Sequence, residues 1–378
     1  MARIRVLVVD DSVVVRKLVT DVLAGDPRIE VVGTAANGKV ALSKMAQVNP
    51  DLVTLDIEMP VMDGLATLVE LRTSYPRLPV VMFSTLTERG TSSTLDALER
   101  GANDYVTKPA NVGSVTASME AVRAQLIPKI IALCTPSAPP ASRPRTSVGA
   151  AAKPVTRATV TRAAPAATAS PARVDVLAIG VSTGGPDALT TVLTRLPADL
   201  PVPVLVVQHM PPLFTKQFAD RLDAKSVLRV SEATRGDAVL PGRVLIAPGD
   251  FHLRTRRCAG GVVASLDQGT PENYCRPAVD VLFRSVAETY GQHVLAVVLT
   301  GMGTDGARSC RDVVAAGGSV IVQDQATSVV WGMPGAVAGA GLASEILPLP
   351  EMVPAILTRL RVGRSQADTR QALEGARP

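Results

Sequence analysis

The first 125 residues alternate between short apolar runs and stretches whose apolar residues recur at helical spacing. The runs favour strands, and the spacing favours helices between them. Five strands interleaved with five helices predict a doubly wound, five-stranded parallel sheet, because parallel neighbours need a helical crossover. The expected strands are RVLVV, EVVGTA, LVTLD, PVVMFS and DYVT, and the helices start near Asp11, Gly38, Gly64 and Thr91, with a last helix ending near Gln125.

The second half of the chain repeats this alternation and predicts another doubly wound, mostly parallel α/β domain. Three of its apolar runs end on polar residues: VDVLAIGV on Ser182, VPVLVVQ on His209 and HVLAVVLTGMGT on Asp305. Loops that leave the carboxyl ends of parallel strands line one crevice. We therefore expect a serine, a histidine and an aspartate, the residues of a serine hydrolase, to converge there.

Between the two patterns lies a segment built from Ala, Pro, Ser and Thr, which predicts a disordered linker. The stretch from Lys129 to Arg173 contains seven Lys and Arg residues and contributes a charge of +7. Since the whole chain has a net charge of +5, the rest of the chain has a net charge near −2. Since only 3% of residues are aromatic as well, nucleic-acid binding is not expected. The chain divides into a first domain 1–126, a linker 127–173, a second domain 174–362 and a polar C-terminal tail 363–378.

The chain begins with MARIRVLVV and contains neither a signal-peptide pattern nor a long apolar run. This favours a cytoplasmic protein without direct membrane insertion. The four cysteines, at positions 134, 258, 275 and 310, show no C-x-x-C pairing. Their spacing argues against a disulfide framework and against a zinc site, so we expect buried or neutral thiols.

Acidic residues end two strands of the first domain. Asp10 and Asp11 follow the first strand, and Asp56 ends the third. Three carboxylates brought together repel one another unless a hard cation such as Mg²⁺ neutralises them, and Mg²⁺ in turn favours a phosphoryl group. Ser84, at the end of the fourth strand, and Lys108, after the fifth, would add a hydroxyl group and a cation.

This set of residues resembles the receiver domain of two-component response regulators, a flavodoxin-like fold, over the whole first domain. The resemblance implies that Asp56 accepts a phosphoryl group from a histidine kinase. It also implies that Asp10 and Asp11, together with Asp56, hold Mg²⁺, and that Ser84 and Lys108 contact the phosphoryl oxygens.

Each of these residues also has an ordinary structural explanation, since Asp is common at helix N-caps and Lys-Pro is common in turns. The prediction therefore depends on their joint placement at the ends of four strands. Two assignments stay open at this point. Thr85 could supply the hydroxyl group in place of Ser84, and Tyr105 is either a switch aromatic or a core ring.

In the second domain, the segment AIGVSTGGPDAL matches G-x-S-x-G through Gly180, Ser182 and Gly184. Small residues allow a sharp strand-to-helix turn around a nucleophile. The helix entered at Pro186 would direct its positive N-terminal dipole toward a developing oxyanion. The segment lacks the Gly-Lys-Ser or Gly-Lys-Thr of a phosphate-binding loop.

Of the three histidines in the chain, only His209 stands where a general base is expected. His252 lies in the polar stretch FHLRTRR, and His293 begins a strand. Asp305 could fix the tautomer of His209, or it could simply cap the helix that follows it. The backbone N–H near Met302 could stabilise the oxyanion.

The order Ser, His, Asp along the chain differs from that of α/β-hydrolases. A receiver, a linker and a domain carrying IGVSTGGP, QHMP and TGMGTDG resemble the chemotaxis-specific protein-glutamate methylesterases of bacteria. The similarity includes NYCRPAVDVLF and DQATSVVWGMPGAV and leaves out the linker and the residues after about Arg361. It implies that Ser182 attacks a carbonyl, His209 moves the proton and Asp305 orients His209.

The resemblance further implies a phosphoprotein that hydrolyses γ-glutamyl methyl esters on methyl-accepting chemotaxis receptors, releases methanol and often deamidates receptor glutamines. Its partners would be a chemotaxis histidine kinase and the chemoreceptors, and a monomer would suffice. Hydrolysis would need no metal, since Mg²⁺ serves the receiver. From the two-domain architecture we also expect the unphosphorylated receiver to cover the crevice around Ser182, and phosphorylation of Asp56 to favour an open arrangement.

Two other functions remain compatible with the sequence. One is a receiver-controlled serine hydrolase that acts on another protein amide or ester. The other is a phosphorylation-controlled binding module without chemistry, although the presence of Ser182, His209 and Asp305 speaks against it.

Overall fold

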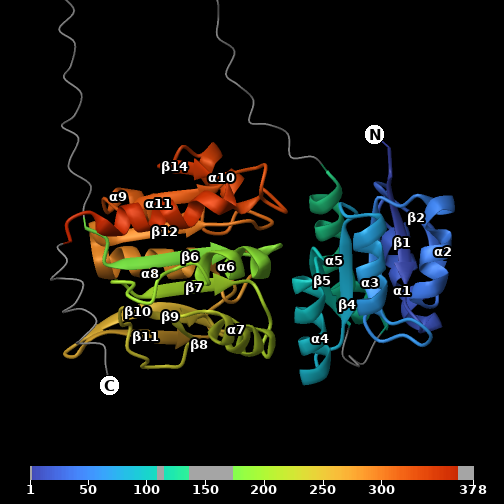
Figure 1. Cartoon of the computed structure of the whole chain (residues 1–378), viewed down its shortest axis with the longest axis horizontal. Helices are drawn as coiled ribbons and strands as arrows, with labels where there is room; N and C mark the ends of the chain where they lie inside the picture. The colour runs from blue at the N-terminus through green and yellow to red at the C-terminus, as the bar shows by residue number, and fades with distance from the viewer. Residues whose placement is uncertain (1, 109–114, 136–172, 365–378) are drawn as a thin grey trace, which may run out of the picture.

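The computed structural model describes residues 2–108, 115–135 and 173–364, which form two α/β domains (Figure 1). Most of the expected linker, and almost all of the expected C-terminal tail, lie outside the described residues. No helix in the described part of the chain is long and apolar enough to cross a membrane.

The N-terminal domain is a five-stranded parallel sheet in the order β2-β1-β3-β4-β5, as predicted. Four of its helices begin where a polar side chain accepts a hydrogen bond from the N–H three residues later, which fixes their first turns. The elements are β1 (Ile4–Val9), α1 (Val13–Ala24), β2 (Ile29–Ala35), α2 (Gly38–Val48), β3 (Leu52–Asp56), α3 (Gly64–Ser74), β4 (Val80–Ser84), α4 (Glu88–Glu99), β5 (Asp104–Thr107) and α5 (Val115–Cys134).

Helix α5 corrects the predicted end of this domain. It continues through Pro128 to Cys134, so residues 127–134 are helix and not the start of the linker. Ile127 and Ile130 are buried beside the sheet. Burying one such side chain contributes about 1.5–3 kcal/mol, so the two together match or exceed the cost of about 3 kcal/mol for a proline inside a helix.

The C-terminal domain is a seven-stranded parallel sheet in the order β14-β13-β12-β6-β7-β9-β8, with a separate antiparallel ribbon, β10-β11. This confirms the mostly parallel prediction. The elements are β6 (Val176–Val181), α6 (Gly185–Leu193), β7 (Val204–Gln208), α7 (Phe214–Lys225), β8 (Arg229–Glu232), β9 (Arg243–Ile246), β10 (His252–Cys258), β11 (Gly261–Asp267), α8 (Val279–Tyr290), the 3₁₀ turn Gly291–His293, β12 (Val294–Val298), α9 (Ser309–Ala315), β13 (Ser319–Gln323), α10 (Met333–Gly339), β14 (Glu345–Leu347) and α11 (Leu349–Arg361).

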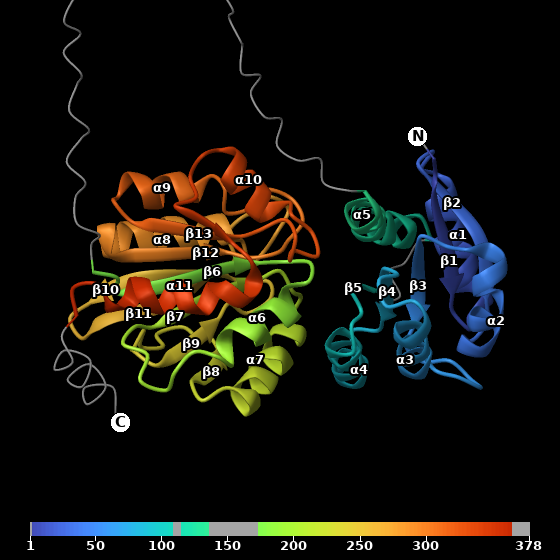
Figure 2. The same cartoon turned by 45° about the horizontal axis from the view of Figure 1, so that its top comes forward.

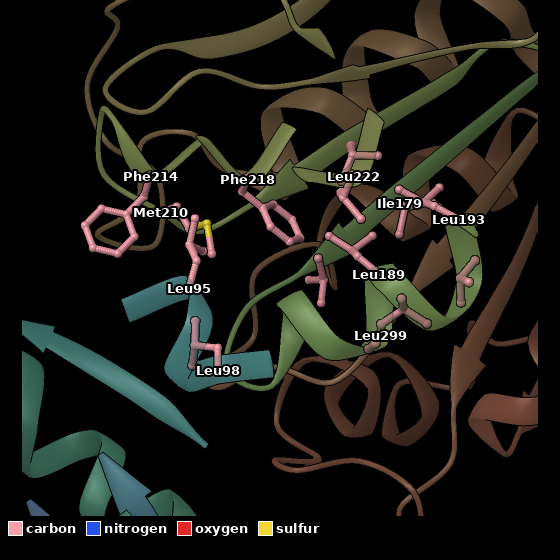
Figure 3. Packing of buried hydrophobic residues seen from close by; sticks show 14 of the residues in the cluster. Leu95, Leu98, Ile179, Leu189, Leu193, Met210, Phe214, Phe218, Leu222 and Leu299 are labelled. Atoms are coloured by element: carbon pink, nitrogen blue, oxygen red, sulfur yellow. The ribbon is translucent and has the colours of Figure 1, made fainter. Parts of the chain in front are cut away.

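The two domains meet through α4 and β5 on one side and α6 and α7 on the other, as both views show (Figures 1 and 2). Leu95 and Leu98 of α4 belong to the same buried cluster as Phe214 and Phe218 of α7, and Figure 3 shows these side chains close together. The ring of Tyr105 stacks on that of Phe214, with centroids 4.5 Å apart. One apolar core therefore runs across the domain boundary.

Candidate active site and phosphorylation site

Ser182 lies in the sharp turn between β6 and α6. Its N–H donates to the carbonyl of Thr300, which fixes the turn against the loop after β12. Gly184 has a φ of 74° and leaves no room for a side chain, because an added Cβ would lie 2.6 Å from Val329. These constraints explain the small residues around Ser182 in the sequence motif.

His209 follows β7, directly beside this turn. Gln208 joins the two segments, because its Nε2 donates to the carbonyl oxygens of Ser182 (3.0 Å) and His209 (3.3 Å). Sequence reasoning missed Gln208, although a polar residue that ends an otherwise apolar strand is a signal for such a role. The other two histidines are elsewhere: His252 contacts Thr270, and His293 contacts Arg173.

Asp305 binds His209 directly. Its Oδ2 accepts from His209 Nε2 at 2.8 Å and from the N–H of Val279 at 2.6 Å. Its Oδ1 accepts from the N–H of Asp280 and of Gly306 and from Asn273 Nδ2. The carboxylate is therefore buried but has five donors around it, which keeps it ionised and fixed.

The alternative that Asp305 caps the helix following it is wrong, because α9 begins only at Ser309. Asp305 instead binds the first N–H groups of α8, whose own N-cap residue, Ala278, provides no side-chain acceptor. The positive end of α8 adds to the stabilisation of the negative charge.

The pKa values of the pair follow from these contacts. Burial raises the pKa of Asp305, but the hydrogen bond from His209 and those from α8 lower it by more, so it lies below its usual value. Burial lowers the pKa of His209, but the charge of Cys275 and the hydrogen bond to Asp305 outweigh it and raise the pKa. The ionised Asp305 thus stabilises the imidazolium that forms when His209 takes up a proton.

The turn before α8 brings two residues that sequence reasoning missed to this pair. Asn273, at a φ of 51°, donates to both Asp305 and Asp280. Cys275 places its Sγ 3.6 Å from Nδ1 of His209. Their only sequence signal is an Asn, a residue that tolerates positive φ, just ahead of an Arg-Pro.

Gly301 lies against the turn that carries Ser182. An added Cβ on Gly301 would be 3.0 Å from Ser182 Cβ, so the loop approaches as closely as a glycine allows. Within the described residues, the N–H of Met302 donates to no protein acceptor, and the Ser182 hydroxyl forms no hydrogen bond. Both groups are therefore free to bind a substrate.

A small cavity of about 20 Å³ lies between the two domains, beside Ser182 and His209. Such a space holds about one water molecule. At its wall, Thr183 Oγ1 donates to Asp104 Oδ2 at 2.5 Å, and Lys129 pairs with Asp104 at 2.7 Å. The N-terminal domain contributes Leu98, Asn103, Asp104, Tyr105 and Lys129, and the C-terminal domain contributes Ser182, Thr183, Gly184, Pro186, Gln208, His209 and Met210.

In the N-terminal domain, the structure brings the three predicted carboxylates together. Carboxylate oxygens of Asp10, Asp11 and Asp56 lie within 4.8 Å of one another. The ammonium group of Lys108 is 3.0 Å from Asp10 and 2.8 Å from Asp56. These contacts are to the buried Oδ2 atoms of Asp10 and Asp56, which have no other polar partner among the described residues.

Ser84 and Thr85 take different positions. The Ser84 hydroxyl is buried and tied to α4, because it donates to the carbonyl of Gly90 and accepts from Thr94 Oγ1 at 2.5 Å. Thr85, not Ser84, lines the cavity of about 270 Å³ above Asp56. Tyr105 is buried and packs in the core that joins the domains.

Comparison with known proteins agrees with both halves of the chain. The family model for CheB methylesterase matches residues 177–356, and that for the response regulator receiver domain matches residues 6–120. A protein-glutamate methylesterase/protein-glutamine glutaminase of a Nocardioides species is 58% identical over 95% of this chain and 96% of its own length. A protein of the same name from Trichodesmium erythraeum is 48% identical over 95% of this chain and 100% of its own length.

Among solved structures, the CheB methylesterase catalytic domain of Thermotoga maritima is 44% identical and covers 50% of this chain and 99% of its own, with a TM-score of 0.48. The sequence identity to curated relatives extends over almost the whole chain, receiver and catalytic domain together. The chain therefore belongs to the family of protein-glutamate methylesterase/protein-glutamine glutaminases, the CheB methylesterases with an N-terminal receiver domain.

Proposed function

We propose that this chain hydrolyses γ-methyl esters of glutamate on chemotaxis receptors, and deamidates receptor glutamines, under the control of phosphorylation at Asp56. One observation carries the proposal: Ser182 and His209, the latter held by Asp305, line a single cavity that receiver residues close. A hydrolytic site beneath a phosphorylation domain is the arrangement that such control requires.

In the proposed reaction, Ser182 Oγ attacks the side-chain carbonyl carbon of the substrate and His209 takes the hydroxyl proton. Because Nε2 of His209 donates to Asp305, the lone pair that accepts this proton is on Nδ1. The proton then passes to the departing methoxide, which leaves as methanol, or, in deamidation, to the departing amide nitrogen, which leaves as ammonia. Water, activated by His209, hydrolyses the acyl-serine and restores the enzyme.

We assign stabilisation of the tetrahedral oxyanion to the N–H of Met302. Two observations support this assignment. Gly301, which precedes Met302, approaches Ser182 closely, and the N–H of Met302 has no acceptor among the described residues. A fixed, desolvated donor at this place favours the transition state over the ester ground state.

The receiver residues fit a hard divalent cation, because Asp10, Asp11 and Asp56 offer clustered carboxylates, and the buried Oδ2 atoms of Asp10 and Asp56 have only the ammonium group of Lys108 as a polar partner among the described residues. Mg²⁺ bound by these three residues would neutralise the charge of an incoming phosphoryl group. Asp56 is the proposed phosphoryl acceptor, and Lys108, which already contacts it, would bind a phosphoryl oxygen.

The Asp56 carboxyl group should titrate near pH 6 in protein free of Mg²⁺. Burial raises its pKa to about 6 against the opposing effect of Lys108, and the charge of Asp10 raises it further. Since the pKa is raised, protonation appears as pH falls through 6, and bound Mg²⁺ should move it to lower pH. Carboxyl-carbon NMR titrations with and without Mg²⁺ measure both values, and an unshifted titration near pH 4 would contradict this picture.

Control would follow from helix α4. Ser84 is bonded to Gly90 and Thr94 of α4, and the same helix carries Leu95 and Leu98 into the interface with the catalytic domain. We propose that the phosphoryl group draws the Ser84 hydroxyl away from Thr94, with Thr85 as a further contact. Loss of these bonds would loosen α4 and open the site at Ser182.

The proposed partners are a chemotaxis histidine kinase as phosphodonor and the cytoplasmic helices of chemoreceptors as substrate, so the enzyme would act in the cytoplasm, as a monomer. The test is methanol release from methylated receptor cytoplasmic fragments. Release by the phosphorylated chain is expected. No release, with phosphorylation of the receiver verified, would count against this substrate and favour another protein amide or ester.

A further inference from the structure

Cys275 lies beside Nδ1 of His209, the ring nitrogen that does not contact Asp305. Sγ of Cys275 lies 3.6 Å from Nδ1 of His209. A tetrahedral zinc ion with a sulfur ligand at about 2.3 Å and a nitrogen ligand at about 2.0 Å holds those two atoms roughly 3.5 Å apart. The pair therefore stands at the separation that a shared zinc ion requires, with little movement.

Asp305 prepares His209 for such a ligand. Metal-binding histidines generally donate their other N–H to a carboxylate, which fixes the tautomer. Here Nε2 donates to Asp305, so Nδ1 is the unprotonated nitrogen, and its lone pair faces the Cys275 thiol. Asp305 itself is not a ligand in this arrangement, because its two oxygens already accept five hydrogen bonds.

The position of Cys275 is built into the fold. The backbones of Glu272 and Cys275 bond to each other in a tight turn. Glu272 pairs with Arg284 of α8 at 2.5 Å, and Asn273 ties the turn to Asp305. Cys275 is half-buried, so an ion can reach it. The thiol is thus preorganised toward the imidazole.

We propose that Cys275 and His209 form a binding site for a thiophilic divalent cation such as Zn²⁺, completed by water, and that occupation of this site inhibits hydrolysis. The ion would occupy the Nδ1 lone pair that takes the proton of Ser182. Zinc and related metals prefer thiolate and imidazole donors, whereas the Mg²⁺ that serves the receiver prefers oxygen, so the two ions would not compete. The inhibition, though not the binding, rests on the proposed function.

Binding is tested with Co²⁺, whose bond to a thiolate gives a near-ultraviolet absorption that needs no enzyme activity. The full-length protein should show this band, Zn²⁺ should remove it, and Cys275→Ser should lack it. The variant should bind Zn²⁺ at least roughly tenfold more weakly, as measured by calorimetry. Cys258→Ser, which removes an exposed thiol on the ribbon β10-β11, is the matched control and should behave as wild type. A band that is absent from wild type, or that persists in Cys275→Ser, would overturn the site.

Inhibition is tested by methanol release at constant Mg²⁺, with each protein compared with its own zinc-free rate. Zn²⁺ should inhibit wild type and Cys258→Ser at concentrations roughly tenfold below those that inhibit Cys275→Ser. Equal inhibition of all three would overturn the inhibitory role of the site. If no protein releases methanol, the proposed function fails, while the Co²⁺ absorption still decides the binding site.

Discussion

Replacing Ser182 by alanine is expected to lower methanol release by roughly 10⁴-fold or more, because no other group is proposed to form the acyl intermediate. The substitution removes one oxygen at a turn whose shape is fixed by Gly184 and by the bond to Thr300. Folding and receiver phosphorylation should therefore be unchanged. Methanol release by the phosphorylated variant, with a thermal unfolding curve, measures both expectations.

Ser265→Ala is the matched control for this prediction. Ser265 lies on strand β11 in the same domain, outside the site, and the substitution removes the same atom. Its rate should equal that of wild type. If Ser182→Ala kept more than about a tenth of the wild-type rate, with correct folding, nucleophilic attack by Ser182 would be ruled out and the chemistry would have to be reassigned.

Reversing the charge of Arg221 is expected to raise methanol release by the unphosphorylated chain. Arg221 of α7 contacts Asp96 at 2.6 Å and Glu99 at 3.4 Å, and it donates to Ser92, all on α4. Arg221→Glu would place a third carboxylate beside two others. The substitution removes these partly exposed ion pairs and adds repulsion between carboxylates. Together the two effects should lower the free energy that favours the closed arrangement by about 1–2 kcal/mol, which corresponds to a roughly 5–30-fold higher basal rate.

Two further variants make this prediction specific. Arg235→Glu causes the same charge change at an exposed position that has no ion pair within the described residues, and it should leave the basal rate unchanged. Asp96→Arg combined with Arg221→Glu restores opposite charges across the interface and should lower the basal rate again. A basal rate of Arg221→Glu equal to wild type would show that these contacts do not hold the site closed.

Much of the fold was predictable because most strands of the two sheets are short apolar runs that are followed by a turn and a helix. The end of α5 was not, because Pro128 indicates a helix end locally, whereas burial of Ile127 and Ile130 depends on the sheet beneath them. Such burial is a tertiary effect, which a local pattern cannot contain.

The site residues likewise divide into those that the sequence predicts and those that depend on tertiary contacts. Ser182, His209 and Asp305 could be anticipated because parallel strand ends share one edge of a sheet. Gln208 and Asn273 could not, since their roles depend on hydrogen bonds to Ser182, His209 and Asp305 across the fold. Cysteine spacing argued against a zinc site, but Cys275 and His209 are 66 residues apart and meet only in the folded chain. The hydrogen bond between Ser84 and Thr94 could not be anticipated either, because the direction of the Ser84 hydroxyl depends on side-chain packing.

The most direct test of phosphorylation-controlled hydrolysis is the rate of methanol release by the full-length chain, with and without a small-molecule phosphodonor and Mg²⁺, compared with Asp56→Asn. We expect a low rate without phosphodonor, because receiver residues close the cavity at Ser182. The rate should rise on phosphorylation in wild type and stay low in Asp56→Asn. Equal rates in wild type with and without phosphodonor, with phosphorylation of Asp56 verified, would contradict the account.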